Sequence, residues 1–241
     1  MTSDKKKRRR KLAIMDNLWI LVGSFVLLKL LVHFGDGFIG KLAVLLHCGD
    51  SSVFQLLLIQ ILQSLCMLGL VFFFLFGIRR RKLKTIGLVP FRDKSWIIKS
   101  ALWGVGICIL MMFVVQIMVA IFPQFAKPQD VSTIISESRS SLEWIAAFVS
   151  AGLLAPITEE IVFRGYLFHS LRNYYPEKLC IVITALVFGL MHMDLFRLFP
   201  FFVSGIFLNL CALRSRTILG SMIMHGVWNT LMLVFTYVAL A

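Results

Sequence analysis

The chain has 241 residues, of which 59% are hydrophobic and 15% are charged. A soluble domain carries about 25% charged and about 45–50% apolar residues, so this composition excludes an ordinary soluble globular protein. A transmembrane helix needs about 20 mostly apolar residues, which leaves room for roughly six to eight of them in a chain of this length. The sequence therefore predicts a single polytopic helical membrane protein.

The formal net charge of +13 arises from 25 Lys and Arg against 12 Asp and Glu. Fifteen of these 25 basic residues lie in two blocks, at 5–11 and 79–99, which flank apolar segments. Because cytoplasmic loops concentrate Lys and Arg, we interpret the blocks as topology signals that can also contact anionic lipid headgroups. We therefore expect membrane lipids as partners and no nucleic acid, and we expect the N-terminus to be cytoplasmic.

Apolar runs along the chain indicate helices, because a backbone in lipid must satisfy its own hydrogen bonds. In chain order the seven runs are Leu18–Phe34, Val53–Ile78, Trp96–Phe122, Leu142–Arg172, Lys178–Met193, Phe196–Leu213 and Thr217–Leu240. The fifth and sixth runs are short and almost continuous, so they can form one re-entrant or kinked unit that bends at Gly189, Pro200 and Gly205. The predicted fold class is all-α, an integral membrane bundle of about seven transmembrane helices.

Positive charge falls on alternate connections: the N-terminus, the 79–94 loop, the 172–178 stretch and the Arg214/Arg216 turn. A consistent orientation requires this alternation, and it puts the C-terminus on the opposite side from the N-terminus. We divide the chain into a basic cytoplasmic tail at 1–17, N-terminal transmembrane helices at 18–141 and a second transmembrane domain at 142–241. The five cysteines are scattered and form no CxxC pair, so no disulfide framework or thiolate zinc site is indicated.

Glu159 and Glu160 lie near the middle of the longest apolar run. A charge near the bilayer centre costs at least about 2.5–3.5 kcal/mol, so it usually faces protein or water and indicates function. Arg164 follows Glu160 by four residues and can pair with it on one helix face, which leaves Glu159 as the free acid. The alternative is a purely structural role, in which all three residues form a buried ion-pair network.

Two histidines and an asparagine lie at a similar depth. His192 lies toward the end of the fifth run, while His225 and Asn229 are four residues apart and share one face of the last helix. At 1.5 Å per residue, Glu159 and these three residues lie about 13–21 Å from the basic ends of their helices. Each alone is typical of an interhelical hydrogen bond, but their convergence inside the membrane favours a functional site.

These residue types can hydrolyse an amide bond without a covalent intermediate. A carboxylate and an imidazole on facing helices can share a water and remove its proton. A second imidazole and a carboxamide can donate hydrogen bonds to the developing oxyanion. Glu159, His192 and His225 could instead bind Zn²⁺ as a His₂Glu set, and the sequence does not separate these two mechanisms.

Three short motifs carry a family resemblance: Glu159-Glu160-x-x-x-Arg164, Phe188-x-x-x-His192 and His225-x-x-x-Asn229. In this order and apolar context they resemble the motifs of the CPBP (Abi) family of intramembrane proteases. That family includes type 2 CAAX prenyl endopeptidases and bacteriocin-processing or immunity proteins. The resemblance covers about residues 142–230, so the domain at 142–241 is expected to be CPBP-like.

The resemblance implies a membrane endopeptidase and assigns roles to four residues. Glu159 and His192 would activate water, while His225 and Asn229 would bind the oxyanion. The substrate would be a membrane-associated or lipid-modified protein. The mechanism would be either glutamate-dependent, without a cofactor, or that of a zinc metalloendopeptidase.

The resemblance also implies that Glu160 and Arg164 organise the site, and we expect Phe188 to orient the ring of His192. Two other functions stay open. The protein could be a non-proteolytic membrane scaffold or bacteriocin-immunity-type protein. It could also be a proton-coupled transporter that uses the buried carboxylates as a relay.

Overall fold

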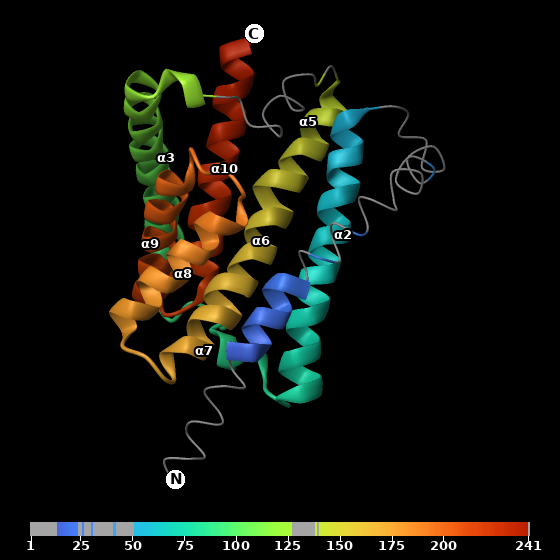
Figure 1. Cartoon of the computed structure of the whole chain (residues 1–241), viewed down its shortest axis with the longest axis vertical. Helices are drawn as coiled ribbons and strands as arrows, with labels where there is room; N and C mark the ends of the chain where they lie inside the picture. Colours follow the sequence, from blue (N-terminus) through green and yellow to red (C-terminus); the bar gives the residue numbers. More distant parts are fainter. Residues whose placement is uncertain are drawn as a thin grey trace.

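The structure is a computed structural model that describes residues 14–23, 26, 30, 41, 51–126, 138 and 140–240. Within these residues it contains helices and no strand, which confirms the predicted all-α class. The helices stand side by side as an upright bundle, with α2 at one edge, α3 at the other, and α6 and α10 between them (Figure 1). The central helices therefore have neighbours on several sides.

The described helices follow the predicted runs closely. Some contain turns of π-helix or 3₁₀-helix, which are labelled η. In chain order they are Ile14–Gly23, α2 (Ser52–Phe72), η1 (Phe73–Ile78), η2 (Leu83–Ile86), α3 (Ser95–Ile121), η3 (Pro123–Phe125), α5 (Ser141–Ala147), η4 (Phe148–Leu154), α6 (Ala155–Glu160), η5 (Ile161–Phe168), α7 (His169–Arg172), α8 (Glu177–Met191), α9 (Leu198–Ser215) and α10 (Ile218–Leu240).

Five helical stretches in the described part of the chain are long and apolar enough to span a membrane. They are Ser52–Ile78, Ser95–Ile121, Ser141–Arg172, Leu198–Ser215 and Ile218–Val238. Of the two other predicted runs, the first lies largely outside the described residues. The fifth forms α8, whose 15 residues are about 22 Å long and thus shorter than the roughly 30 Å hydrocarbon core. The chain is therefore a multi-pass membrane protein.

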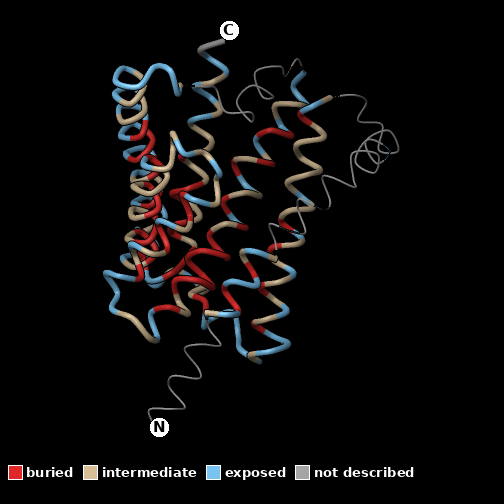
Figure 2. The backbone as a smooth tube through the Cα atoms, viewed as in Figure 1, coloured by how far each residue is buried: buried red, intermediate tan, exposed pale blue. Residues whose placement is uncertain are grey.

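Burial is concentrated where the central helices meet. Buried residues gather on α6, η5, α8, α9 and the lower part of α10, whereas much of α2 and α3 is more exposed (Figure 2). Exposed positions on α2 and α3 include large apolar side chains such as Leu65 and Phe113, as expected for helices that face lipid. The Ser141–Arg172 stretch is the most buried of the five candidate spans.

The bends predicted at Gly189, Pro200 and Gly205 are wrong. α8 and α9 are separate helices joined by a turn at 192–197, and each glycine lies where the helices approach closely. A Cβ on Gly205 would lie 2.9 Å from the Cα of Ala185, and a Cβ on Gly189 would lie 3.0 Å from Leu198 Cδ1. Pro200 lies in the first turn of α9, where a missing N–H breaks no helical hydrogen bond.

We expect Gly205→Ala to lower the free energy of unfolding by about 1–3 kcal/mol, because its Cβ would push α8 away from α9. Gly106→Ala is the matched control, since a Cβ at Gly106 in α3 would meet no atom within 4 Å. Alanine is the better helix former, so the control should be neutral or slightly stabilising. Denaturant unfolding of both purified variants in micelles measures the difference, and equal changes would contradict this interpretation.

Three of the four predicted basic connections meet at one end of the bundle, while the basic N-terminal tail lies outside the described residues. Ile218 N donates to Gly87 O at 3.0 Å, and Thr217 Oγ1 donates to Val89 O at 2.6 Å. Gly87 has a φ of +74°, and a Cβ there would lie 2.7 Å from His169 Cε1, so only glycine fits. These contacts join the 79–94 loop, α7 and the α9–α10 turn.

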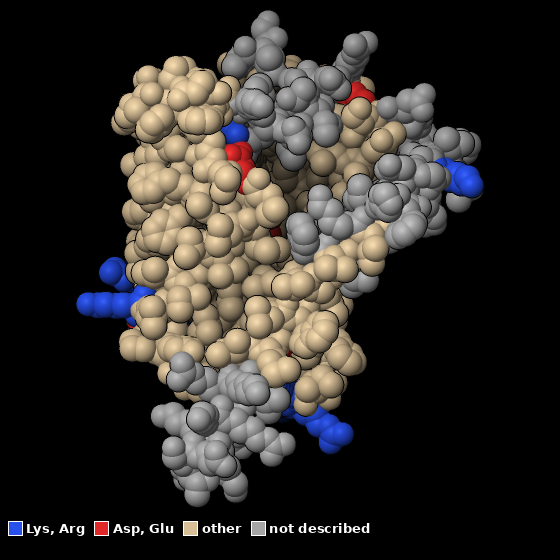
Figure 3. Space-filling model, in the orientation of Figure 1, with Lys and Arg blue, Asp and Glu red and all other residues tan. Residues whose placement is uncertain are grey.

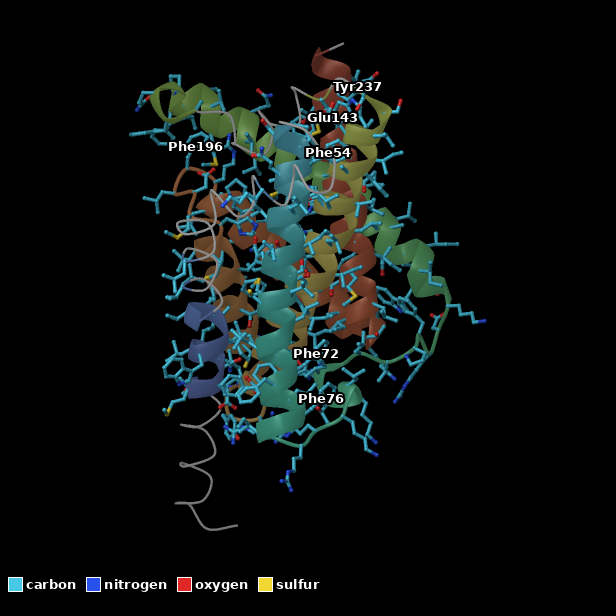
Figure 4. All side chains as sticks on the ribbon, turned by 90° about the vertical axis from the view of Figure 1, so that its right-hand side faces the viewer. Phe54, Phe72, Phe76, Glu143, Phe196 and Tyr237 are labelled. Carbon is cyan, nitrogen blue, oxygen red and sulfur yellow. The ribbon has the colours of Figure 1, made fainter. Side chains whose placement is uncertain are left out.

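The opposite end is closed by contacts between α2, α5 and α10. Ser51 Oγ donates to Glu143 Oε1, and the rings of Trp144 and Tyr237 meet edge to face at 4.6 Å. Glu143 and Tyr237 lie at this end in Figure 4, together with Phe54 near the start of α2, while Phe72 and Phe76 mark its other end. The membrane side that each end faces stays a prediction.

Candidate functional site

The two motif glutamates lie at the end of α6, a short α-helical piece between the π-helical segments η4 and η5. Such π-turns inside α-helices are frequent at functional sites. Each extra residue in a turn shifts the side chains that follow around the helix axis. The residues after position 160 therefore face directions that a regular helix would not give them.

Glu160 and Arg164 form a fully buried ion pair, as the sequence predicted. Arg164 Nη1 donates to Glu160 Oε1 at 2.8 Å, and both side chains are 0% exposed. Arg164 Nη2 also donates to the carbonyl oxygen of Gly205 in α9 at 3.2 Å. The guanidinium thus links the central helix to α9 and neutralises a carboxylate that has no access to solvent.

His225 of α10 joins this pair. Its Nδ1 donates to Glu160 Oε1 at 2.9 Å, so the same carboxylate oxygen accepts from both the imidazole and the guanidinium. On its other edge, His225 Nε2 lies 3.9 Å from Glu159 Oε2. One histidine therefore lies between two adjacent glutamates: its Nδ1 is hydrogen-bonded to Glu160, and its Nε2 faces Glu159.

Glu159 is the carboxylate without a fixed partner. Its Oε2 makes no hydrogen bond within the described residues although the atom is buried, and its side chain is 20% exposed. A buried carboxylate oxygen needs a hydrogen-bond donor. A water or a substrate N–H in the space next to His225 Nε2 could supply that donor.

His192 follows the last residue of α8 and is held by Phe188. Its Nδ1 lies 2.8 Å from the carbonyl oxygen of Phe188. Because a carbonyl oxygen can only accept, Nδ1 carries the proton, and Nε2 of the neutral ring is left as an acceptor. The ring also stacks on Phe201 of α9, with centroids 4.0 Å apart.

The ring of Phe188 lies at the centre of the site. Its centroid is 4.7 Å from that of His192, 5.8 Å from that of His225, and 4.4 Å from Arg164 Cζ. It therefore contacts the ring of His192, the ring of His225 and the guanidinium of Arg164. In the described part of the chain, no hydrogen bond or ion pair joins His192 directly to Glu159.

Asn229 of α10 contacts the backbone of η4 rather than the ion pair. Its Nδ2 donates to the carbonyl oxygen of Ala151 in η4 at 2.8 Å. Ala155 N donates to Ser150 O, so the next bond of this π pattern would run from Pro156 to Ala151. Proline has no N–H, and Asn229 supplies the donor that Ala151 O would otherwise lack.

We expect Asn229→Ala to lower the free energy of unfolding by about 1 kcal/mol, because the partly buried carbonyl of Ala151 loses its donor. In a Pro156→Ala background the cost should shrink, since residue 156 then has an N–H for Ala151 O. Chemical unfolding of the two single variants and the double variant measures this coupling. Strict additivity would show that Asn229 does not compensate for the proline.

The residues proposed for zinc do not form a ligand set. Among the described residues, no three His, Cys, Asp or Glu side chains are grouped closely enough to hold a metal ion. Glu159 and His225 face each other at 3.9 Å, whereas the contacts of His192 are to Phe188 and Phe201. The donor arrangement does not fit a His₂Glu centre, and no step proposed below depends on a metal.

Several contacts at the site were missed by the sequence analysis. Trp228 stacks on His225 with centroids 5.6 Å apart, and its position three residues later on the same helix was an available signal. Pro156 inside a long apolar run was also an available signal for a freed carbonyl. Nothing in the sequence could have predicted that the carbonyl oxygen of Gly205 accepts from Arg164, because every residue has a backbone carbonyl.

Fold and site together define a multi-pass membrane protein with a carboxylate–histidine centre between its helices. The family resemblance of the motifs is confirmed, because residues 141–231 match a family described as type II CAAX prenyl endopeptidase Rce1-like. The match contains all three motifs and, at family level, supports an intramembrane CAAX-type protease.

The chain is also similar to the UPF0177 protein YxdF of Lactococcus lactis subsp. lactis (strain IL1403). The two are 24% identical over 145 residues, which cover 56% of this chain and 77% of the relative. No solved structure gives a significant match.

Proposed function

We propose that this protein is an intramembrane endopeptidase that hydrolyses a peptide bond in a membrane-associated or lipid-modified protein. The observation that carries the proposal is the pairing of Glu159 and Glu160 on the two edges of His225. Glu160 is neutralised by Arg164, whereas Glu159 has no guanidinium beside it and its buried Oε2 has no hydrogen-bond donor within the described residues. A purely structural ion pair would need only Glu160 and Arg164, and would leave Glu159 without a role.

In the proposed reaction Glu159 is the general base. A water in the space between Glu159 and His225 gives a proton to the carboxylate while its oxygen bonds to the carbonyl carbon of the substrate. His192 presents Nε2 as an acceptor and can hold the second hydrogen of that water. Its Nδ1 proton is fixed on Phe188 O, so the ring keeps one orientation.

The tetrahedral intermediate then needs donors for its oxyanion. In the proposed mechanism His225 carries a proton on both nitrogens before the substrate binds and keeps both throughout, so it donates Nε2–H to the oxyanion while Glu160 holds Nδ1–H from the other side. Asn229 Nδ2 carries two N–H groups, one of which donates to Ala151 O, and the other is available to the oxyanion. Glu159 returns its proton to the leaving nitrogen as the C–N bond breaks, which regenerates the carboxylate.

The site suits a substrate held in the membrane. Its residues come from the Ser141–Arg172 and Ile218–Val238 spans and from the end of α8, and most of the described surface visible in Figure 3 is neither acidic nor basic. An extended peptide in lipid would expose polar backbone groups, at a cost of several kcal/mol each. A lipid anchor on the substrate offsets part of this cost by about 0.8 kcal/mol per buried CH₂ group.

The test of the proposed mechanism uses purified protein in liposomes with a prenylated peptide and the same peptide without its lipid. We expect cleavage of the prenylated peptide and little cleavage of the free one. Activity should survive dialysis against a strong chelator, because Glu159 and the histidines suffice. Loss of activity that Zn²⁺ restores would contradict the glutamate mechanism, and solute flux without peptide cleavage would favour a transporter.

A further inference from the structure

A polar cavity lies at the basic end of the bundle, away from the proposed catalytic centre. It has a volume of about 330 Å³ and is bordered by the Ile14–Gly23 helix, η1, η2 and the end of the Ser141–Arg172 helix. Two arginines, Arg79 and Arg81, line it, against a single carboxylate, Asp16. The cavity therefore has an excess of positive charge.

The carboxylate of Asp16 is already used within the protein. Its Oδ2 accepts from Arg79 Nε at 2.6 Å and from the hydroxyl of Tyr166 at 3.2 Å. The hydrogen bond to Asp16 raises the pKa of Arg79 above its ordinary value, and it fixes the position of the guanidinium. The whole guanidinium of Arg81 and those N–H groups of Arg79 that Asp16 and Tyr166 do not use remain as donors for a ligand.

The backbone turn that places these two arginines is unusual for its sequence. Arg80 between them has a φ of +48°, in the left-handed region that favours glycine. Arg81 N donates to Leu75 O, six residues earlier, at 2.8 Å, and this bond closes the end of η1. Because of the turn, Arg79 and Arg81 border the same cavity although they are only two residues apart.

The position of the cavity indicates the source of its ligand. Arg79 and Arg81 follow directly after Ile78, where the Ser52–Ile78 span ends, so they lie where a lipid headgroup would meet water. Leu75, Ile78 and Ile86 provide apolar walls beside the polar groups. Lys and Arg also gather near the lower end of the visible face in Figure 3.

We propose that this cavity binds the phosphate group of an anionic phospholipid headgroup. Two guanidinium groups provide N–H donors that match phosphate oxygens, and the hydroxyl of Tyr174 on the wall can add a further bond. Basic pockets between helices at the cytoplasmic side of a membrane are suited to such headgroups. The proposal is independent of the proposed protease activity.

The test uses the purified full-length protein in neutral micelles and measures the midpoint of thermal unfolding against ligand concentration. Dihexanoyl phosphatidylglycerol should raise the midpoint and reach saturation, and dihexanoyl phosphatidylcholine should not. Arg81→Gln should weaken the apparent affinity about tenfold, because it removes a charge-assisted contact. Arg80→Gly should keep the affinity, because glycine adopts the same backbone conformation.

Arg214→Gln is the matched control, since Arg214 lies at the same end but lines a separate cavity. It should leave the affinity unchanged. Equal weakening by Arg214→Gln and Arg81→Gln would overturn the proposal, because the attraction would then be diffuse. Saturation by inorganic phosphate at the same concentration would overturn the assignment to a lipid, and Arg81→Lys offers a second variant if the glutamine variant does not fold.

Discussion

Arg164→Met is expected to lower the free energy of unfolding by about 3–5 kcal/mol, because it leaves the Glu160 carboxylate buried without its guanidinium partner. Both side chains are fully buried, so no solvent can take the place of the lost bond. The carbonyl oxygen of Gly205 loses a donor as well. Unfolding of the purified protein in mixed micelles, followed by circular dichroism, measures this loss.

Two further variants make this result specific. Arg172→Met removes an arginine that pairs with Glu177 at the protein surface, where both side chains are at least 38% exposed. Its effect should be about 1 kcal/mol or less. The double variant Glu160→Gln/Arg164→Met should cost less than the sum of the two single changes, since it buries no unpaired charge. Equal losses for Arg164→Met and Arg172→Met would contradict the proposed importance of the buried pair.

Glu159→Gln should lower the rate of cleavage about 10²- to 10⁴-fold, because an amide cannot accept the proton of the attacking water. The fold should be retained, since Glu159 Oε2 has no hydrogen-bond partner in the described structure to lose. Cleavage of the prenylated peptide in liposomes measures the rate, and the unfolding midpoint checks the fold.

Glu177→Gln is the matched control for this change, because it makes the same substitution at an exposed carboxylate outside the proposed site. It should leave the rate unaltered. Undiminished cleavage by Glu159→Gln would remove the general base from the proposed mechanism. Loss of both rate and stability would instead favour the structural role that the sequence left open.

The part of the site that could be predicted rests on local geometry and on the cost of charge in lipid. Glu160 and Arg164 are four residues apart, and that spacing alone brings them together on a helix. The depth argument predicted that His225 would lie near the glutamates, and its bonds to Glu160 confirm this. Neither step required knowledge of how the helices pack.

The rest depends on long-range packing and on the backbone. The π-helical segments η4 and η5 have no clear signal in composition, yet they decide which residues face the site. The bonds of Arg164 to Gly205 O and of Asn229 to Ala151 O end on carbonyls, which all residues share. The prediction of bends at Gly189 and Gly205 was wrong because a glycine in a helix can mark either a bend or a close contact with a neighbouring helix. The sequence does not show which helix packs against each glycine, so it cannot distinguish the two.

The most direct test of the central claim compares membrane-peptide profiles of cells that express the wild-type protein, Glu159→Gln or Glu177→Gln. If the carboxylate and histidines meet around one water and hydrolyse a peptide bond, one or more membrane peptides should be shortened by the wild type and by Glu177→Gln. Those peptides should remain intact with Glu159→Gln. Identical profiles for all three proteins, at equal expression, would contradict the claim that this centre is a protease.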